Sequence, residues 1–446
     1  MSSRDLLMSA NVTFWMADAG RSSQTDQGRG ADFDSYGNVY VAGYPSTTGT
    51  LRDPWFVAKY APDGSLIWQK SILGSGTATQ TPDDQPLSLV VNGSNIYVYG
   101  FLDRNLCVLK LDLDGNVVWR SGLVVFGLGS GRNSFAGDSV AVDQSGNVYI
   151  AFSNGSDWVI AKFNSSGVLQ FQNAVRNTAG DPINIASLSI TQPSSGYAIT
   201  QRLFVHVNQF NTFTNNPTNR LITLDLNGAV ITSRTDSFTA PELVYASGAM
   251  ALGPTSTVFS TFSTNAGVVY IDLPGSWVSK ISGLPSATIL GTLGGIAGSE
   301  YLSTLYLYTC FCVSNVMYIF KHNSLGTLMW QRSISLAPGF TLEAKRVRAD
   351  NYGNVYFVGS SSVVEQSAST NLFFGKIPSD GSLTGTYMLG ASPDGYVIYA
   401  ATALSTTSTT SIVSALAYSS PTPTYAAVTP STTSSAATFS STTVII

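Results

Sequence analysis

Hydrophobic residues alternate with small or polar residues in a short phrase that recurs along the chain after a Gly-Asn corner. The phrase reads DSYGNVYVAGY at 34–44, DQSGNVYIAF at 143–152 and DNYGNVYFVG at 350–359, with a weaker copy, NGSNIYVYG, at 92–100. A period of two predicts a β-strand, and the Gly-Asn corner predicts a tight turn before it. The asparagines that open these strands are 57, 52 and 207 residues apart, and 207 is close to four times 52; they are Asn38, Asn95, Asn147 and Asn354.

A second pattern fills the long gap between the last two copies. It is a hydrophobic strand followed by a glycine turn, and it occurs seven times at intervals of 51, 52, 61, 47, 51 and 55 residues, with glycines Gly64, Gly115, Gly167, Gly228, Gly275, Gly326 and Gly381. In four copies an aromatic residue follows the glycine by four positions, at Trp68, Trp119, Phe171 and Trp330. Each unit is interpreted as four antiparallel strands, because Asp-Gly and Asn-Gly supply the positive φ of tight hairpins. Four strands repeated about every 50 residues predict an all-β fold, the β-propeller.

The two ends of the chain leave the number of blades open between seven and eight. The segment 11–20 predicts a lone fourth strand, because Trp15 precedes Trp68 by 53 residues. Residues 400–428 predict three more strands, so that both ends complete an eighth blade; alternatively, seven blades close and the Ser/Thr-rich end is an assembly arm that packs on a neighbour. Eight is favoured slightly. The expected organisation is an N-terminal docking segment at 1–10, a propeller at 11–400 and C-terminal strands at 401–446.

Composition excludes several classes of protein. Charged residues make up 11% of the chain, and 26 Asp+Glu outnumber 22 Lys+Arg, so a nucleic-acid partner is not expected. No signal peptide is recognised in MSSRDLLMSA, and the most apolar stretch, 301–320, is interpreted as two strands around a Ser-Asn corner, not as a membrane span. Cys107, Cys310 and Cys312 suit buried thiols of a chain made in a reducing cytoplasm.

Candidate chemistry is sparse. His206 and His322 are the only histidines of the chain, and both are expected to be structural. Asp112-x-Asp114-Gly resembles the start of a calcium loop, but the later ligands are missing, so a turn is preferred; Asp63 and Asp380 also stand in turns. No catalytic, cofactor-binding or metal-binding residues are therefore assigned, and the chain is not expected to be an enzyme.

The repeat closely resembles the β-propeller repeat of bacterial surface proteins and of tail proteins of tailed bacteriophages. The residues that carry the resemblance are DSYGNVYVAGY…WFVAKYAPDGSLIWQKSILGSG and DQSGNVYIAF…WVIAKFNSSGVLQFQ, and MSSRDLLMSA looks like the start of phage tail structural proteins. The resemblance implies a structural virion protein of the tail or tail fibre, a platform for assembly and host-surface attachment. It would be made in the host cytoplasm, form an oligomer, and contact other tail proteins and a host glycan or protein.

Two other functions are weighed against this one. A secreted propeller that binds or degrades polysaccharide predicts a polar pocket on the ring axis, with converging Tyr, Arg and carboxylates. A bacterial surface lectin or adhesin predicts an export signal.

Overall fold

The computed structural model describes strands and many of the turns between them, and all of the described regular structure is β. The described residues are 15–20, 25–46, 54–74, 85–102, 105–124, 139–153, 157–177, 183–191, 200–211, 216–237, 244–252, 257–264, 269–273, 277–282, 293–301, 304–323, 327–350, 352–363, 370–388, 396–401, 405–409, 412–414, 418–419, 426–428, 432–436 and 440–445. The expected docking segment at 1–10 lies outside them.

The described strands form seven antiparallel sheets, which we call blades 1 to 7. Blades 1 to 3 comprise β2 (Thr25–Phe33), β3 (Val39–Ser46), β4 (Trp55–Tyr60) and β5 (Leu66–Gly74); β6 (Gln85–Asn92), β7 (Asn95–Leu102), β8 (Asn105–Asp112) and β9 (Val117–Val124); and β10 (Val140–Val142), β11 (Val148–Ser153), β12 (Asp157–Phe163) and β13 (Leu169–Asn177). Blades 4 and 5 comprise β14 (Ile183–Ile190), β15 (Leu203–Asn211), β16 (Asn216–Leu224) and β17 (Val230–Ser237), then β18 (Val244–Leu252), β19 (Thr257–Thr264), β20 (Val269–Leu273) and β21 (Trp277–Ser282). Blades 6 and 7 comprise β22 (Leu293–Tyr301), β23 (Thr304–Val313), β24 (Val316–Asn323) and β25 (Leu328–Leu336), then β26 (Phe340–Ala349), β27 (Val355–Val363), β28 (Thr370–Ile377) and β1 (Trp15–Gly20).

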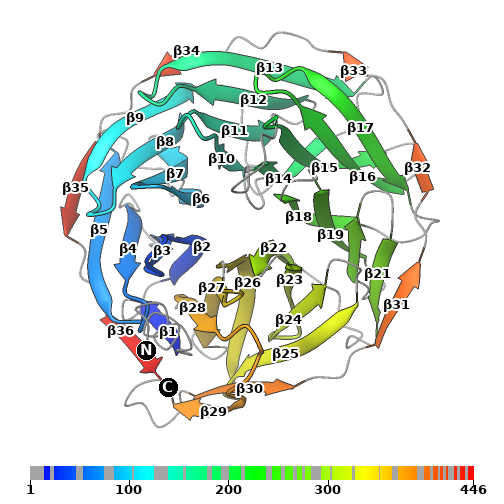
Figure 1. Cartoon of the computed structure of the whole chain (residues 1–446). Helices are drawn as coiled ribbons and strands as arrows, with labels where there is room; N and C mark the ends of the chain where they lie inside the picture. Colours follow the sequence, from blue (N-terminus) through cyan, green and yellow to red (C-terminus); the bar gives the residue numbers. More distant parts are fainter. Residues whose placement is uncertain are drawn as a thin grey trace, which may run out of the picture.

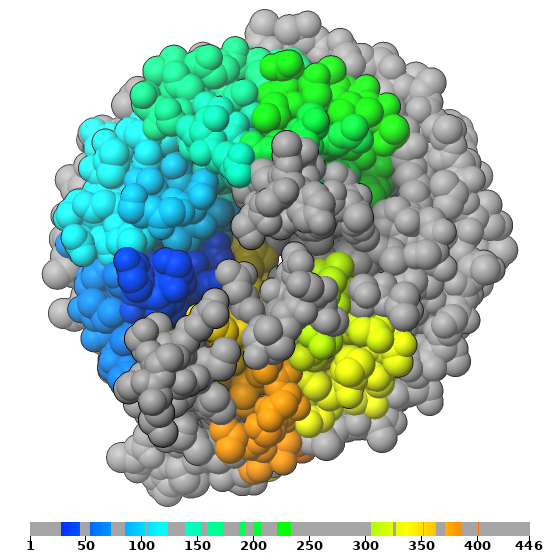
Figure 2. Space-filling view, in the orientation of Figure 1, coloured from blue at the N-terminus to red at the C-terminus, as the bar shows by residue number. Residues whose placement is uncertain are grey.

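The blades stand in a ring, with the first strand of each innermost (Figure 1). In the space-filling view, blades 1 to 4 form one arc from blue to green, and blades 6 and 7 form a second arc from yellow to orange (Figure 2). Inner strands of successive blades pack on one another all the way round, including β26 and β27 of blade 7 on β2 of blade 1. The β-propeller prediction is therefore confirmed.

Blade 7 takes its fourth strand from the start of the chain. β1 pairs with β28, with Trp15 opposite Lys376 and Ala19 opposite Leu372. The lone fourth strand predicted around Trp15 is thus confirmed, but the slight preference for an eighth blade is wrong, because this strand completes blade 7. Hydrophobic side chains join that blade to blade 1: the ring of the partly buried Phe33 stacks on the buried Tyr356 ring, with centroids 4.9 Å apart.

The C-terminal tail runs back around the outside of the ring. Its strands are β29 (Gly385–Met388), β30 (Tyr396–Ala401), β31 (Ser405–Thr409), β32 (Ile412–Ser414), β33 (Tyr418–Ser419), β34 (Ala426–Val428), β35 (Thr432–Ala436) and β36 (Ser440–Ile445). β29 pairs with β30, and β30 to β36 pair antiparallel with the outermost strands of blades 6, 5, 4, 3, 2, 1 and 7, in that order. We call β30–β36 the belt. The belt is neither an eighth blade nor an arm that packs on a neighbouring chain. One part of the closure prediction holds, because β1 from the start of the chain and β36 from its end pair within one blade.

Strand twist explains how one segment reaches every blade. Each strand is rotated by roughly 20–25° from its neighbour, so the outermost strand of a blade lies along the circumference (Figure 1). This strand runs along the circumference toward the next blade. A belt strand that pairs antiparallel with it therefore runs toward the preceding blade. Successive belt strands begin six to nine residues apart, and an extended chain of that length spans about 20–30 Å. The belt pairs with part of the outer edge of each of the seven described sheets, from two residue pairs in blade 3 to six in blade 7. Unpaired sheet edges are open to pairing with other chains.

The recurring phrase forms a hydrogen-bonded turn at the start of the second strand. In blade 3 the Asp143 carboxylate accepts bonds from the Asn147 backbone N–H at 2.8 Å, from Asn147 Nδ2 at 2.7 Å and from the Tyr149 hydroxyl at 3.1 Å. Asp34 and Asp350 accept the same set of bonds in blades 1 and 7. The phrase recurs because its Asp, Asn and Tyr are the three members of this network.

The second pattern joins neighbouring blades. The Trp68 indole N–H donates to the Leu113 carbonyl of the next blade at 3.0 Å, and its ring covers Gly115, where an added Cβ would lie 2.9 Å from the ring. Trp119 and Trp330 make the equivalent bonds to blades 3 and 7. Lys59 lies over the Tyr40 ring at 5.3 Å and donates to the same Leu113 carbonyl. The recurring aromatic and glycine are thus two sides of one inter-blade contact.

Candidate functional site

The histidines and cysteines are in the interior of the ring. His206 and His322 are buried on β15 and β24, and burial lowers the pKa of His322 to about 4. Cys107, Cys310 and Cys312 are buried thiols outside any disulfide, as the sequence predicts. Burial raises the pKa of Cys312 to about 12, and its thiol donates to the Leu342 carbonyl at 2.8 Å. These groups pack the blades and face no described open surface.

The turn aspartates bond to their own backbone. Asp112 accepts bonds from the N–H groups of Asp114 and Asn116, and Asp63 and Asp380 accept the N–H two residues ahead. The predicted turns at these aspartates are therefore confirmed. Within the described ranges, no group of three or more His, Cys, Asp or Glu side chains is placed to hold a metal ion.

The apolar stretch at 301–320 divides as predicted into β23 and the start of β24. Ser314 and Asn315 form the corner with φ of 50° and 65°. No helix long and apolar enough to cross a bilayer occurs in the part of the chain that the structure describes.

One face of the ring gathers exposed hydrophobic side chains. The first and third hairpins of a blade both turn on the same face, because successive strands are antiparallel; we call it the hairpin face. Large hydrophobic side chains that are exposed in the described regions all lie in these turns or within the first two residues after them: Tyr36, Leu66, Ile67, Val118, Val168, Val230, Ile231, Met329, Tyr352 and Leu383. Three exposed acids, Asp63, Asp114 and Asp380, stand in the same turns. In the described turns, the hairpin face thus exposes large hydrophobic side chains among polar ones, together with three acids.

A second candidate site lies at the inner strands, where blades 7, 1 and 2 meet. The inner strands of six blades each skip one residue in their pairing, which marks a β-bulge at Arg29, Leu87, Ala186, Ser247, Gly294 and Lys345. Bulges re-aim side chains and are common next to binding sites. Only Arg29 and Lys345 of these six carry charge, and they belong to adjacent blades.

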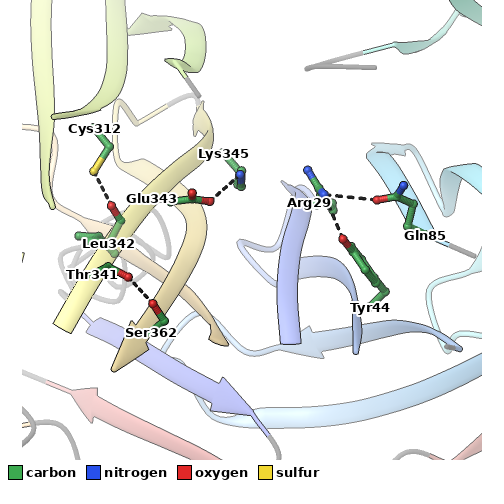
Figure 3. A network of polar contacts seen from close by, with 9 residues as sticks. All are labelled: Arg29, Tyr44, Gln85, Cys312, Thr341, Leu342, Glu343, Lys345 and Ser362. Carbon is green, nitrogen blue, oxygen red and sulfur yellow. Dashed lines mark hydrogen bonds and ion pairs between the residues drawn. The ribbon is translucent and has the colours of Figure 1, made fainter. Parts of the chain in front are cut away.

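Five polar side chains meet there, and we call them the axial cluster: Arg29, Tyr44, Gln85, Glu343 and Lys345 (Figure 3). Arg29 donates to the Tyr44 hydroxyl at 3.1 Å and to Gln85 Oε1 at 3.3 Å. Lys345 pairs with Glu343 at 2.7 Å. Burial is the main cause that lowers the pKa of Lys345, and the charge of Arg29 adds to it, whereas Glu343 raises it.

A mostly buried ionic network lies on the same two inner strands as the axial cluster, β2 and β26. Arg346 donates to the Ser88 hydroxyl of blade 2 at 3.0 Å. Gly30 of blade 1 packs against the same strand, where an added Cβ would lie 2.6 Å from the Leu89 backbone nitrogen. Arg348 lies 3.7 Å from Asp32, which in turn accepts the Val91 N–H at 2.8 Å. Burial lowers the pKa of both arginines and raises that of Asp32. The network connects blades 7, 1 and 2 at the ring closure.

Sequence reasoning missed both candidate sites. The axial cluster depends on bulges, which a period of two does not reveal. One signal was available: aligning the inner strands on the recurring Asp brings Arg29 and Lys345 to the same position of the repeat.

Comparison with protein-family models and with curated proteins finds no match. Among solved structures, the Dos1 propeller aligns with 8% identity and a TM-score of 0.35, over 78% of this chain and 92% of that one. A structure from a study of two prolyl endopeptidases aligns with 10% identity and a TM-score of 0.30, over 81% of this chain and 57% of that one. At these identities and TM-scores, neither likeness carries an argument about this chain.

Proposed function

We propose that the chain is a structural virion protein of a tailed bacteriophage, a ring-shaped platform in the tail or a tail fibre. The hairpin face carries the proposal. Its exposed aliphatic side chains come from blades 1, 2, 3, 4, 6 and 7, so they follow the ring instead of forming one small spot. Burying the exposed half of such a side chain stabilises a complex by about 1 kcal/mol.

The occupant of the hairpin face is a neighbouring tail protein with an apolar and basic surface. Basic charge is expected because Asp63, Asp114 and Asp380 stand among the aliphatic side chains. A second copy in face-to-face contact is disfavoured, because it would place these acids against one another. The resemblance of the repeat to phage tail propellers supports the same assignment.

The belt supports a role in a long-lived particle. A propeller whose outer sheet edges are paired with its own chain offers few edges to other chains and resists opening. Such a body suits a platform that must keep its shape outside the cell.

The test is immunogold electron microscopy of particles from a host that carries the gene, with antibodies against the ring. Gold at a fixed place on the tail is expected. The double variant Val118→Glu, Val168→Glu should fold but be lost from particles, whereas the control Gln144→Glu, Gln170→Glu adds the same charge at exposed positions of this face and should be retained. Particles without the chain, or equal retention of both variants, would refute the proposal.

A further inference from the structure

Two tyrosines stand exposed at the same place in neighbouring blades. Tyr36 of blade 1 and Tyr352 of blade 7 are the third residues of the recurring turn, and they are 77% and 40% exposed. The backbone N–H of each donates at 2.9 Å to the carboxylate that begins its turn, Asp34 or Asp350. Neither ring has a side-chain partner among the described residues. The two turns therefore hold both tyrosines at fixed places on the hairpin face.

The two turns are connected through blade 7. A Cβ added at Gly37, the residue after Tyr36, would lie 3.9 Å from the Tyr356 hydroxyl. That hydroxyl donates to the Asp350 carboxylate at 3.1 Å, and the same carboxylate accepts the Tyr352 N–H. Tyr36 and Tyr352 therefore belong to one region of the hairpin face, at the closure of the ring.

An exposed acid stands beside this region. The same Cβ at Gly37 would lie 3.6 Å from the Pro62 ring in the third hairpin of blade 1, and Asp63 follows Pro62. The Asp63 carboxylate accepts bonds from the Ser65 hydroxyl at 2.6 Å and from the Ser65 N–H at 2.9 Å, and these bonds hold its pKa below the usual value. Among the described residues, no basic side chain pairs with it. The acid is therefore ionised and available to a cation from outside.

The repeat places Asp63 at the boundary with blade 7. In three other blades the residue at the position of Pro62 accepts a hydrogen bond from a lysine of the preceding blade: Leu113 from Lys59, Leu226 from Lys162 and Ser379 from Lys321. Pro62 and Asp63 therefore stand on the side of blade 1 that meets blade 7, which carries Tyr352. We call Tyr36, Tyr352 and Asp63 the closure patch.

Blades 2 and 3 show that the turns do not require these side chains. Blade 2 has an acid in its third hairpin, Asp114, but Gly93 at the position of the tyrosine. Blade 3 has Ser145 at the position of the tyrosine and Ser166 at that of the acid. The tyrosines and the acid of the closure patch are thus additions to a turn that folds without them.

We infer that the closure patch binds an arginine side chain of the neighbouring protein on the hairpin face. A guanidinium stacks on aromatic faces and pairs with a carboxylate through parallel N–H bonds, so it suits exposed tyrosine rings beside an ionised acid. The negative charge of the patch favours a cation over a neutral sugar, which exposed tyrosines also bind. The inference rests on the proposed function for its partner, but its chemistry is tested without particles.

The test is isothermal titration calorimetry of the full chain with a short peptide that contains two arginines separated by glycine. Matched peptides replace the arginines with citrulline, which keeps the shape without the charge, or with lysine, which keeps the charge without the planar group. Binding of the arginine peptide should be at least fivefold tighter than that of the citrulline peptide and at least twofold tighter than that of the lysine peptide. Equal binding of either matched peptide, no binding, or tighter binding of the neutral disaccharide cellobiose would overturn the inference.

Variants assign the binding to the closure patch. Tyr36→Ser introduces the residue that blade 3 has as Ser145, so the turn is kept, and it should weaken binding about 2- to 5-fold, the range of one exposed cation–π contact. Asp63→Asn should weaken it by up to about fivefold, as the loss of an exposed ion pair does. Asp114→Asn is the matched control, because blade 2 has the acid without the tyrosine, and it should change nothing. Unchanged binding in Tyr36→Ser, or equal effects of the two Asp→Asn variants, would overturn the inference.

The peptide result and the particle result separate this inference from the proposed function. A chain that is absent from particles but binds the arginine peptide as expected would refute the virion role and leave the closure patch as a guanidinium site. A chain that is present on the tail but does not bind the peptide would overturn this inference alone.

Discussion

Asp143→Asn tests whether the recurring turn is a stabilising unit of each blade. The Asp143 carboxylate is buried and accepts three hydrogen bonds, two from Asn147 and one from the Tyr149 hydroxyl. An amide in its place can keep its oxygen toward Asn147 Nδ2 and Tyr149, but its NH₂ group then faces the Asn147 backbone N–H. At least one charge-assisted bond is lost in the interior, and a buried donor is left facing another donor.

The expected loss is about 2–3 kcal/mol, because hydrogen bonds to charged groups contribute about 1.5–3 kcal/mol and a buried unsatisfied donor adds to the cost. Asp112→Asn is the matched control. Asp112 bonds Asn116 in the same way, but these bonds are exposed, so water replaces them at a cost of about 0.5–1 kcal/mol. Urea unfolding followed by tryptophan fluorescence measures both. Equal losses in the two variants would refute a special role for the buried carboxylate.

Three further predictions concern the ring itself. Gly115→Ala should cost about 2–4 kcal/mol, since φ is +79° and the new Cβ would lie 2.9 Å from the Trp68 ring, whereas Gly93→Ala, at φ +59° with nothing within 4 Å, should cost only about 1 kcal/mol; similar losses in urea unfolding would contradict the inter-blade contact. Burial lowers the folded-state pKa of His322 from 6.5 to about 4, so the unfolded chain binds more protons between these values, and stability should be full above about pH 6.5 and fall by about 3 kcal/mol as the pH drops to 4. Blade 2 has Leu111 at the position equivalent to His322. The variant His322→Leu should therefore remove that part of the acid sensitivity, and an unchanged pH profile of the melting temperature would contradict the role of His322. A chain that ends at Met388 loses the belt and should expose the outer edges of the blades, so analytical ultracentrifugation should show association that the full chain lacks; a monomeric truncated chain would contradict an edge-covering role.

Local chemistry made the blades predictable from the sequence. The Asp, Asn and Tyr of the recurring turn are within seven residues of one another, so the pattern that carries the turn is visible in a single stretch. The glycine and the aromatic also recur in fixed register, although they meet only between neighbouring blades. Trp15 could be placed as a fourth strand because it repeats the spacing of Trp68.

The belt and the axial cluster were not predictable in the same way. Belt strands are only two to six residues long, their Ser- and Thr-rich sequence has none of the Asp-Gly or Asn-Gly turns that mark the blades, and their partners lie up to several hundred residues away. Such segments match three strands of an eighth blade as well as they match a belt. The axial cluster combines residues from β2, β3, β6 and β26, and a one-residue bulge turns Arg29 and Lys345 away from the alternation that predicts strand faces.

A designed disulfide tests the belt most directly. Ser71 of β5 and Ser435 of β35 are paired residues, and directly opposed antiparallel residues have Cα atoms about 4.5–5.5 Å apart, within the range of a disulfide. The double variant Ser71→Cys, Ser435→Cys should oxidise to a cross-link within one monomer, read by mass spectrometry after proteolysis. The decoy Ser71→Cys, Ser408→Cys, whose second residue pairs with blade 5, should not. Covalent dimers, or cross-linking that is equal in the two variants, would contradict a tail that belts its own ring.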